Sequence, residues 1–534
     1  MAVTGIVLTP IGAAAQPGVA IRPIQQCAEL VRGFTVPGVV AHVTAAAVVP
    51  AGTGHPEYCD VRGYIEPAVG FQLKLPTNTF SGRYVQYGCG GFCGAVPAAP
   101  FADCGEPAGG DVAVAATDDG HTRPGADPSG YGSWGAMSQA ARNDFFYRAP
   151  HVLLLAAKHI IATYYGAPPA RSYFTSCSNG GREGLLLAQR YPTDFNGIIA
   201  GAPANYFGPL MGVYQAWLAK TNTGPQDAPI ITSAKLPALH NAVLAACDGL
   251  DGQLDGQIDD PRQCRFDPAT LQCADATDQP SCLTATQVDA ARKLYGGPTD
   301  PAGRHLYPGG ETYGSELAWN KWLITDRVSG STAGTFADDY LKFLGYPIGT
   351  PHSSLAAFQF TVPEFDRLAP EGVKSNAVSL DLEGFRRAGG KLIIWHGWAD
   401  QAIPPAGTLD YYERLWQRSG GLPETQQWAR LFMIPAMYHC AGGDRLTEFD
   451  PLRELVAWVE HGTAPERIVA NQKDDQGRII RSRPVFPYPV QARYAGTGSI
   501  DDAASFVAAP PPVAPHDTVD WVGADLFSLP APVG

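Results

Sequence analysis

The chain has 534 residues, with 45% hydrophobic and 17% charged side chains and a net charge of −13 at neutral pH. Intrinsic disorder combines low hydrophobicity with high charge, so this composition excludes it and predicts a folded protein with a large core. The 51 acidic residues outnumber the 38 basic ones, which excludes the basic surface that binding to a phosphate backbone requires. We therefore expect no nucleic-acid partner.

Eleven cysteines indicate an oxidising compartment, where disulfides persist. Zinc binding is the alternative, but the sequence has no Cys-x-x-Cys pair, and its closest cysteine spacings lack nearby histidines. Residues 1–21 contain Pro, Gly and Gln and no basic residue, so they are typical of neither a signal peptide nor a spanning helix. We expect a secreted or periplasmic protein, with its signal already removed and no membrane partner.

Apolar periodicity predicts the first elements in chain order. Alternating patterns predict strands within residues 33–50, 64–76 and 83–89, and a spacing of three to four predicts a helix over 137–165. A strand at 170–176 runs into a tight turn and an amphipathic helix within 177–192, and a buried strand follows at 195–203. This order is a βαβ unit, which indicates a parallel sheet.

The regular pattern breaks after Pro203. Residues 205–387 combine scattered Gly and Pro, four cysteines and short helical pieces, which predicts an inserted domain. Strands are expected again at 391–400 and 430–443, followed by an amphipathic helix over 451–462 and a Pro-rich extended tail in the last 50 residues. The predicted organisation is an α/β core with a parallel sheet, formed by 1–204 and 388–534, with this large domain inserted between its two parts.

The segment around Ser178 has the pattern of a nucleophile elbow. A serine between a strand and a helix, followed by two glycines, projects its hydroxyl at the carboxyl end of the strand, where turn amides face a developing oxyanion. The first glycine of the usual Gly-x-Ser-x-Gly motif is Ser176 here. The alternative is a serine that only caps the helix.

A serine nucleophile needs a base and an acid. In α/β-hydrolases, these follow the serine along the chain in the order Ser, acid, His. Asp400 and His439 each come just after a predicted strand, so both emerge at the same sheet edge as Ser178. Cys177 precedes the serine and Cys440 follows the histidine, so a disulfide between them would join the two catalytic loops. His396, near Asp400, is interpreted as a core residue that could also line the site.

Two further motifs complete the predicted site. Glycines 88, 90 and 91 follow the strand residues 83–87, where a backbone N–H can approach a substrate oxygen without an intervening side chain. We expect the amides of Gly91 and Asn179 to form the oxyanion hole. The inserted region contains four aspartates spaced by three or four residues, with glycines between them: Asp248, Asp251, Asp255 and Asp259. This pattern predicts a calcium loop, and the alternative is an acidic turn without metal.

These motifs resemble the tannase and feruloyl esterase family. The similarity runs from about Cys27 to Phe506 and is strongest in segments 165–204, 247–261, 393–405 and 438–443. The resemblance implies an α/β-hydrolase with a lid, a Ser178, Asp400 and His439 triad, and a Cys177–Cys440 disulfide. It also implies a structural calcium, held by the side chains of Asp248, Asp251 and Asp255 and the carbonyls of Gln253 and Gln257.

The family often has a late cysteine pair whose places hold Phe486 and Val507 here. The remaining cysteines then pair, by the same resemblance, as Cys27–Cys59, Cys247–Cys264, Cys273–Cys282 and Cys93–Cys104, which leaves Cys89 free.

The sequence predicts a serine carboxylesterase, a monomer or homodimer. The resemblance implies that its substrates are small esters of hydroxycinnamic or hydroxybenzoic acids, as in feruloyl esterases and tannases. The aromatic-rich segment 316–324 is expected to form the acyl-binding wall. Hydrolysis of mono(2-hydroxyethyl) terephthalate is the alternative activity. A binding protein with an inactive triad, and an enzyme that uses calcium in catalysis, are the alternatives from other classes.

Overall fold

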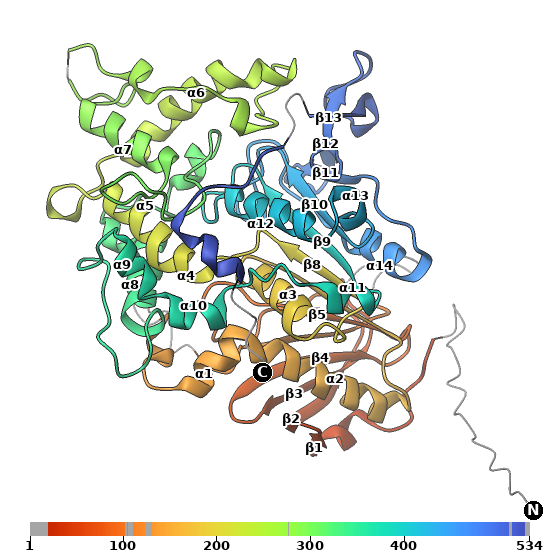
Figure 1. Ribbon diagram of the computed structural model, residues 1–534. Coiled ribbons are helices and arrows are strands. Elements are labelled where there is room, and N and C mark those ends of the chain that lie inside the picture. The colour runs from red at the N-terminus through yellow and green to blue at the C-terminus, as the bar shows by residue number, and fades with distance from the viewer. Residues whose placement is uncertain are drawn as a thin grey trace, which may run out of the picture.

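The computed structural model describes residues 20–101, 104, 110–122, 131–275, 277–511 and 515–528, so most of the N-terminal stretch interpreted as neither signal peptide nor spanning helix lies outside the described residues. A ten-stranded mixed sheet forms the centre of the described chain (Figure 1). Its strands are ordered β1-β2-β3-β4-β6-β5-β7-β8-β9-β10. Their bounds are β1 Gly33–Val36, β2 Val39–Val49, β3 Tyr58–Ile65, β4 Val69–Pro76, β5 Arg83–Tyr87, β6 Ala113–Thr117, β7 Arg171–Cys177, β8 Gly197–Gly201, β9 Lys391–Gly397 and β10 Ala429–Ile434.

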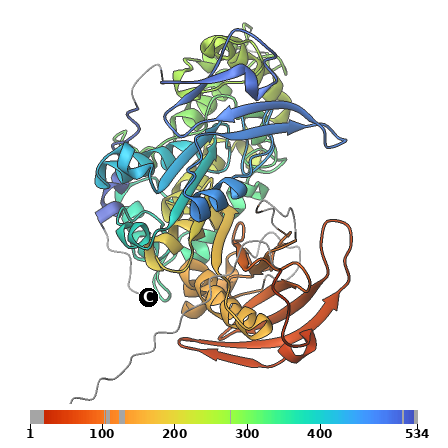
Figure 2. The ribbon, with the colours of Figure 1, turned by 90° about the vertical axis from the view of Figure 1, so that its right-hand side faces the viewer.

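The sheet has an antiparallel half and a parallel half. Strands β1 to β4 pair antiparallel, and β4 pairs antiparallel with β6. From β6 through β5, β7, β8 and β9 to β10, all pairs are parallel. Figure 2 shows β1 to β4 at the end of the molecule away from the green helices. The carboxyl ends of the six parallel strands therefore share one edge.

Helices cover both faces of the parallel half, which explains the nearly continuous apolar runs of β8 and β10. On β8, Ile198 packs in a core with Leu185 of α3, and Ile199 points to the opposite core with Leu455 of α14. Both sides of β8 are thus buried. The helices are α1 Gln139–Asn143, α2 Ala149–Tyr165, α3 Asn179–Arg190, α4 Phe207–Pro209, α5 Gln215–Thr221, α6 Leu236–Cys247, α7 Ala285–Gly296, α8 Thr332–Asp339, α9 Val362–Asp366, α10 Ala369–Ser375, α11 Glu383–Arg387, α12 Pro405–Arg418, α13 Leu422–Thr425 and α14 Leu452–His461.

The long connection between β8 and β9 contains helices α4 to α11 and, within its described residues, none of the named strands. Figure 1 shows α6 and α7 at the top left and α5, α8 and α9 at the left, all to one side of the sheet. Among the described residues, no helix is both long and apolar enough to cross a bilayer.

Three expectations about elements need correction. The strand expected within 64–76 is two strands, because the chain turns around Pro67, which has no N–H for a ladder. Strand β6 was not predicted, because its five buried residues are mostly small alanines without an alternating pattern. The tail expected to be extended contains a short hairpin of β13 Gln491–Tyr494 and β14 Phe506–Ala509, beside the hairpin of β11 Ile468–Lys473 and β12 Ile479–Val485.

Candidate active site

Ser178 lies in a strained turn between β7 and α3. Its φ of 66° and ψ of −124° belong to a region that side chains rarely adopt, and such strain is typical of a nucleophile turn. The two following glycines are required by packing: a Cβ on Gly180 would lie 2.0 Å from Ser176 Oγ, and one on Gly181 would lie 2.2 Å from the Gly201 carbonyl. The Ser178 side chain makes no capping hydrogen bond to α3, which speaks against the interpretation as a simple helix cap.

The structure brings Ser178, Asp400 and His439 together at the carboxyl edge of the parallel strands. His439 Nε2 lies 2.9 Å from Ser178 Oγ, and His439 Nδ1 lies 2.8 Å from Asp400 Oδ2. The imidazole therefore joins a hydroxyl on one side to a carboxylate on the other, as proton transfer from the hydroxyl requires.

Asp400 is completely buried and accepts hydrogen bonds from several donors. Its Oδ1 accepts from the backbone N–H groups of Ala402 and Ile403, at 2.8 and 2.9 Å. Burial by itself raises the pKa of this carboxyl, but the neighbouring His439 and the hydrogen bonds from both histidines lower it below its ordinary value. The acid therefore stays ionised beside His439.

His396 is the second histidine on Asp400, and the sequence interpretation as a core residue missed this contact. Its Nε2 lies 3.1 Å from Asp400 Oδ2 and 2.9 Å from the Ile403 carbonyl, and its Nδ1 lies 2.8 Å from Thr408 Oγ. A carbonyl accepts only from N–H, so Nε2 carries the proton and Nδ1 accepts from the threonine hydroxyl. The spacing of four residues to Asp400, across the end of β9, was the available signal.

The structure joins Cys177 to Cys440, the two neighbours of the serine and the histidine. Cys27–Cys59, Cys247–Cys264 and Cys273–Cys282 also form. The expected Cys93–Cys104 pair is wrong: Cys93 bonds to Cys89 instead, so Cys89 is not free. These two lie in one tight loop with Cα atoms 5.9 Å apart, whereas Cys104 is buried in another core near Val85 and Val112.

Of the two residues expected to form the oxyanion hole, Asn179 directly follows Ser178, and Gly91 lies in the loop whose Cys89 carbonyl accepts from the Asn179 side chain. Gly91 lies in the loop after β5, next to β7 in the sheet, and has a φ of 60° that favours glycine. Asn179 begins α3 directly after the serine, so its amide lies at the amino end of the helix. Two aromatic rings from the inserted region also reach this edge: Trp322 lies 5.8 Å from the His439 ring, and Phe336 contacts the space beside Gly91.

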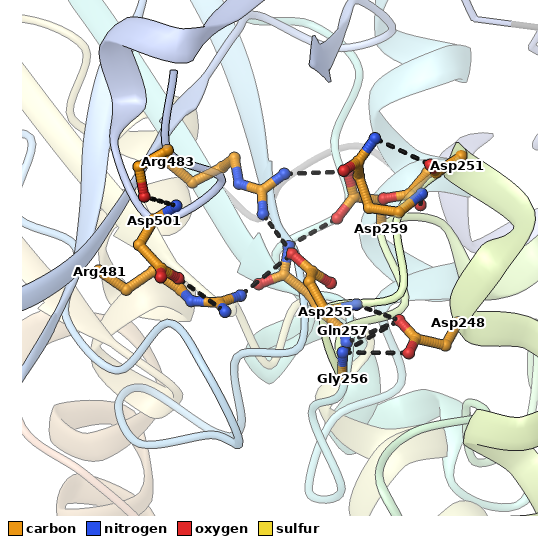
Figure 3. A network of polar contacts seen from close by, with 12 residues as sticks. Asp248, Asp251, Asp255, Gly256, Gln257, Asp259, Arg481, Arg483 and Asp501 are labelled. Atoms are coloured by element: carbon orange, nitrogen blue, oxygen red, sulfur yellow. Dashed lines mark hydrogen bonds and ion pairs between the residues drawn. The ribbon is translucent and has the colours of Figure 1, made fainter. Parts of the chain in front are cut away.

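The aspartate loop, residues 248–259, lies near the β11–β12 hairpin, as Figure 3 shows. Asp248 accepts from the backbone N–H groups of Asp255, Gly256 and Gln257 at 3.1 to 3.2 Å, which closes the loop. Asp251 is packed against Asp259, and burial followed by the charge of Asp259 raises the pKa of Asp251 to about 7.

Two arginines of β12, which the sequence analysis did not consider, also reach the aspartate loop. Arg483 Nη2 and Arg481 Nη1 lie 2.6 and 3.1 Å from Asp255 Oδ2 (Figure 3). Arg481 also pairs with Asp501 at 2.8 Å. No sequence pattern links residues more than 220 positions apart, so only the fold reveals this contact.

The sheet order and the chain of serine, histidine and aspartate at its carboxyl edge define an α/β-hydrolase-type fold. Feruloyl esterase B from Aspergillus oryzae has this fold with a TM-score of 0.75 and 26% identity, over 89% of this chain and 98% of that one. The family model for tannase and feruloyl esterase matches residues 51–509.

Two proteins of known sequence are similar over most of the chain. The mono(2-hydroxyethyl) terephthalate hydrolase of Piscinibacter sakaiensis is 35% identical over 90% of this chain and 89% of that protein. A probable feruloyl esterase of Arthroderma benhamiae is 31% identical, over 82% and 81%. The chain belongs to the tannase and feruloyl esterase family, and it is a carboxylic ester hydrolase.

Proposed function

We propose that the protein hydrolyses its esters through an acyl-enzyme on Ser178. Ser178 Oγ attacks the ester carbonyl while His439 Nε2 takes its proton, and the protonated imidazole then donates this proton to the leaving alcohol. Water, activated by the same histidine, releases the acid. The observation that carries the proposal is His439, hydrogen-bonded to Ser178 on one ring nitrogen and to Asp400 on the other.

Asp400 has the role of holding the imidazole in one tautomer. Its carboxylate accepts from Nδ1–H, which leaves Nε2 free of a proton and able to accept from the serine hydroxyl. The negative charge also stabilises the imidazolium that forms. The amides of Gly91 and Asn179 are proposed to donate to the oxyanion of the tetrahedral intermediate, an effect of about 3–4 kcal/mol for each donor in comparable sites.

The proposed substrates are esters of hydroxycinnamic or hydroxybenzoic acids. Trp322 and Phe336 support an aromatic acyl group, because both rings face the catalytic edge and aromatic rings pack well against each other. Both come from residues 205–387, which supports a lid that builds the acyl pocket. The 35% identity to the terephthalate half-ester hydrolase favours the second candidate, mono(2-hydroxyethyl) terephthalate.

Hydrolysis assays test this function directly. Methyl ferulate, methyl gallate and mono(2-hydroxyethyl) terephthalate are each incubated with wild type and with Ser178→Ala, and acid release is followed at fixed pH. We expect turnover of at least one ester and a loss of at least about 10⁴-fold in Ser178→Ala. Ser172→Ala, at the other end of β7, is the control and keeps activity. A small activated ester, 4-nitrophenyl acetate, is assayed as well. If wild type and Ser178→Ala hydrolyse all four esters at equal rates, the mechanism is contradicted.

We also propose that the aspartate loop holds a structural calcium ion. The donor set consists of hard oxygen atoms: the loop has four carboxylates, of which Asp255 and Asp259 pair with two guanidinium groups, and one of these also pairs with Asp501, so negative charge is in excess. Asp255 Oδ1 and Gln257 Oε1 are buried without a hydrogen-bond partner. Asp251 and Asp259 line a cavity of about 280 Å³. The proposed ligands are Asp248, Asp251, Asp255 and the carbonyls of Gln253 and Gln257.

The ion would cross-link the loop by neutralising carboxylates that otherwise repel one another. Removal of calcium by a chelator should therefore lower the melting temperature, and re-addition should restore it. Asp251→Asn should bind less calcium, measured by elemental analysis, and lose the chelator effect. Asp267→Asn, an exposed aspartate of the same region paired with Arg292, is the control. Loss of turnover by the chelated enzyme at an unchanged melting temperature would favour calcium in catalysis instead.

Secretion is proposed on the disulfides. Five bonds form among the described cysteines, and such bonds persist in oxidising compartments. Localisation of the tagged protein, expressed from its natural gene in the native host, would test this. Recovery outside the cytoplasm is expected, and recovery from the cytoplasm alone would contradict it.

A further inference from the structure

Two buried carboxyl groups, of Asp119 and Glu183, lie behind the loop that follows β5. Asp119 comes two residues after β6, and Glu183 lies in the second turn of α3. Their exposed fractions are 0% and 2%, and the two carboxyl groups hydrogen-bond to each other. Since β5 lies between β6 and β7, these two residues meet across the carboxyl end of β5. The triad does not use either of them.

One of the two carboxyl groups must carry a proton, because two carboxylates have no hydrogen to share. Glu183 is the acceptor: its Oε1 accepts from Asn179 Nδ2 at 2.7 Å, and its Oε2 accepts from Cys89 N–H at 3.3 Å. Asp119 Oδ2 lies 3.0 Å from Cys89 Sγ, a disulfide sulfur with no proton to donate. Asp119 is therefore the protonated partner, and it donates to the Glu183 carboxylate.

The Glu183 carboxylate connects the two segments expected to supply the oxyanion donors. It holds the backbone of Cys89, in the loop that carries Gly91, and the side chain of Asn179, the residue after the nucleophile. Asn179 Nδ2 also donates to the Cys89 carbonyl at 3.3 Å. A Cβ on Gly88 would lie 2.5 Å from Glu183 Oε2, so the loop can approach the carboxylate this closely only with glycine there.

Arg182 compensates the buried negative charge. Its guanidinium is fully buried, and its Nε donates to Asn179 Oδ1 at 2.8 Å. Its other nitrogens donate to the carbonyls of Phe145, Phe146 and Ser375. Asn179 is thus oriented at both ends of its amide, by an arginine on the oxygen and by the glutamate on the nitrogen.

We propose that ionised Glu183, hydrogen-bonded by protonated Asp119, is a positioning residue that fixes the Gly88–Gly91 loop relative to Asn179 and so sets the geometry of the oxyanion hole. The inference rests on the proposed esterase function. Protonation of Glu183 would remove one of its three accepted hydrogen bonds and loosen the hole. Activity should then depend on two groups at acid pH, the base His439 and the carboxylate of Glu183.

Several charged groups surround the pair. They are Arg182 on α3, then Asp118 and His121 after β6, and beyond Asp118 the ion pair of Asp144 with Arg148. Burial raises the pKa of Glu183 to about 7, against the lowering effect of Arg182 and of the hydrogen bond from Asp119. Burial likewise raises the pKa of Asp118 to about 6 and lowers that of His121 to about 4.

The test compares wild type with Glu183→Gln and Asp119→Asn on 4-nitrophenyl acetate from about pH 5 to about 9. In Glu183→Gln, the amide N–H₂ replaces an oxygen that accepts from Cys89 N–H or Asn179 Nδ2, so one of these hydrogen bonds is lost. We therefore expect kcat to fall about 10- to 100-fold, with KM within about threefold of wild type. In wild type, log kcat/KM should fall on the acid side with a slope greater than one, because two groups titrate. In Glu183→Gln this slope should fall to one. The Asp119→Asn variant still offers an amide N–H to the Glu183 carboxylate, so it should keep kcat within about threefold.

Asp111→Asn is the matched control, because Asp111 is a buried carboxyl at the opposite end of β6, paired with Arg83. It should keep kcat and the wild-type pH profile, whatever it does to the melting temperature. The proposal is overturned if Glu183→Gln keeps the wild-type kcat and acid limb, or if Asp119→Asn loses as much kcat as Glu183→Gln. Equal rates for wild type and Ser178→Ala would instead overturn the esterase mechanism on which the inference depends.

Discussion

The Cys177–Cys440 disulfide should contribute both to stability and to catalysis, and the structure allows the two effects to be separated. It closes a loop with a sequence separation of 263 residues, whereas Cys273–Cys282 closes one of only 9. In the chain-entropy description, a cross-link stabilises by restricting the unfolded chain, with a contribution of about 5.6 kcal/mol for the long loop and about 2.6 kcal/mol for the short one. The expected difference is about 3 kcal/mol.

The experiment uses two double variants, Cys177→Ala/Cys440→Ala and Cys273→Ala/Cys282→Ala. Each loses two sulfur atoms, so differences in cavity cost largely cancel. Equilibrium unfolding in urea gives the free energies, and ester hydrolysis gives kcat. The Cys177→Ala/Cys440→Ala variant should also have a lower kcat. The disulfide joins the residue before Ser178 to the residue after His439, and so holds the Ser178 and His439 side chains, which lie 2.9 Å apart, in place. Equal destabilisation of the two variants, or an unchanged kcat in the first, would refute this reasoning.

Two further predictions concern histidines. His396→Phe removes a hydrogen bond to the buried Asp400 carboxylate, worth about 1.5–3 kcal/mol, so kcat should fall by about 10- to 100-fold; His396→Gln, which keeps an N–H, should retain more, and equal rates in both would contradict the role. Burial lowers the pKa of His240, but its hydrogen bonds to Asp444 and Glu316 outweigh burial and raise that pKa to about 9. The stability that protonated His240 contributes is therefore complete below about pH 6.5 and is lost as pH rises through 9. Urea unfolding should show a loss of about 3 kcal/mol over that range which His240→Gln lacks; parallel curves would refute it.

Local sequence patterns were sufficient for the elements that position the site. The apolar run before Ser178, the glycines after it and the apolar runs before Asp400 and His439 specify strand ends, because backbone sterics and burial act over a few residues. The structure places His439 within hydrogen-bonding distance of both Ser178 and Asp400. The sequence likewise predicted the parallel strands β5 and β7 to β10, whereas β6, short and rich in alanine, carried too little pattern.

Contacts between distant segments were decided only by the tertiary structure. The choice of Cys89 over Cys104 as the partner of Cys93 depends on how one loop folds back, which spacing does not specify. Glu183 on Asp119, and Arg483 on Asp255, join groups from separate elements. The physical reason is desolvation: a charge removed from water must find a proton, a counter-charge or a hydrogen-bond donor. Which partner meets that need depends on the arrangement of whole elements in space, and a local sequence pattern contains no record of it.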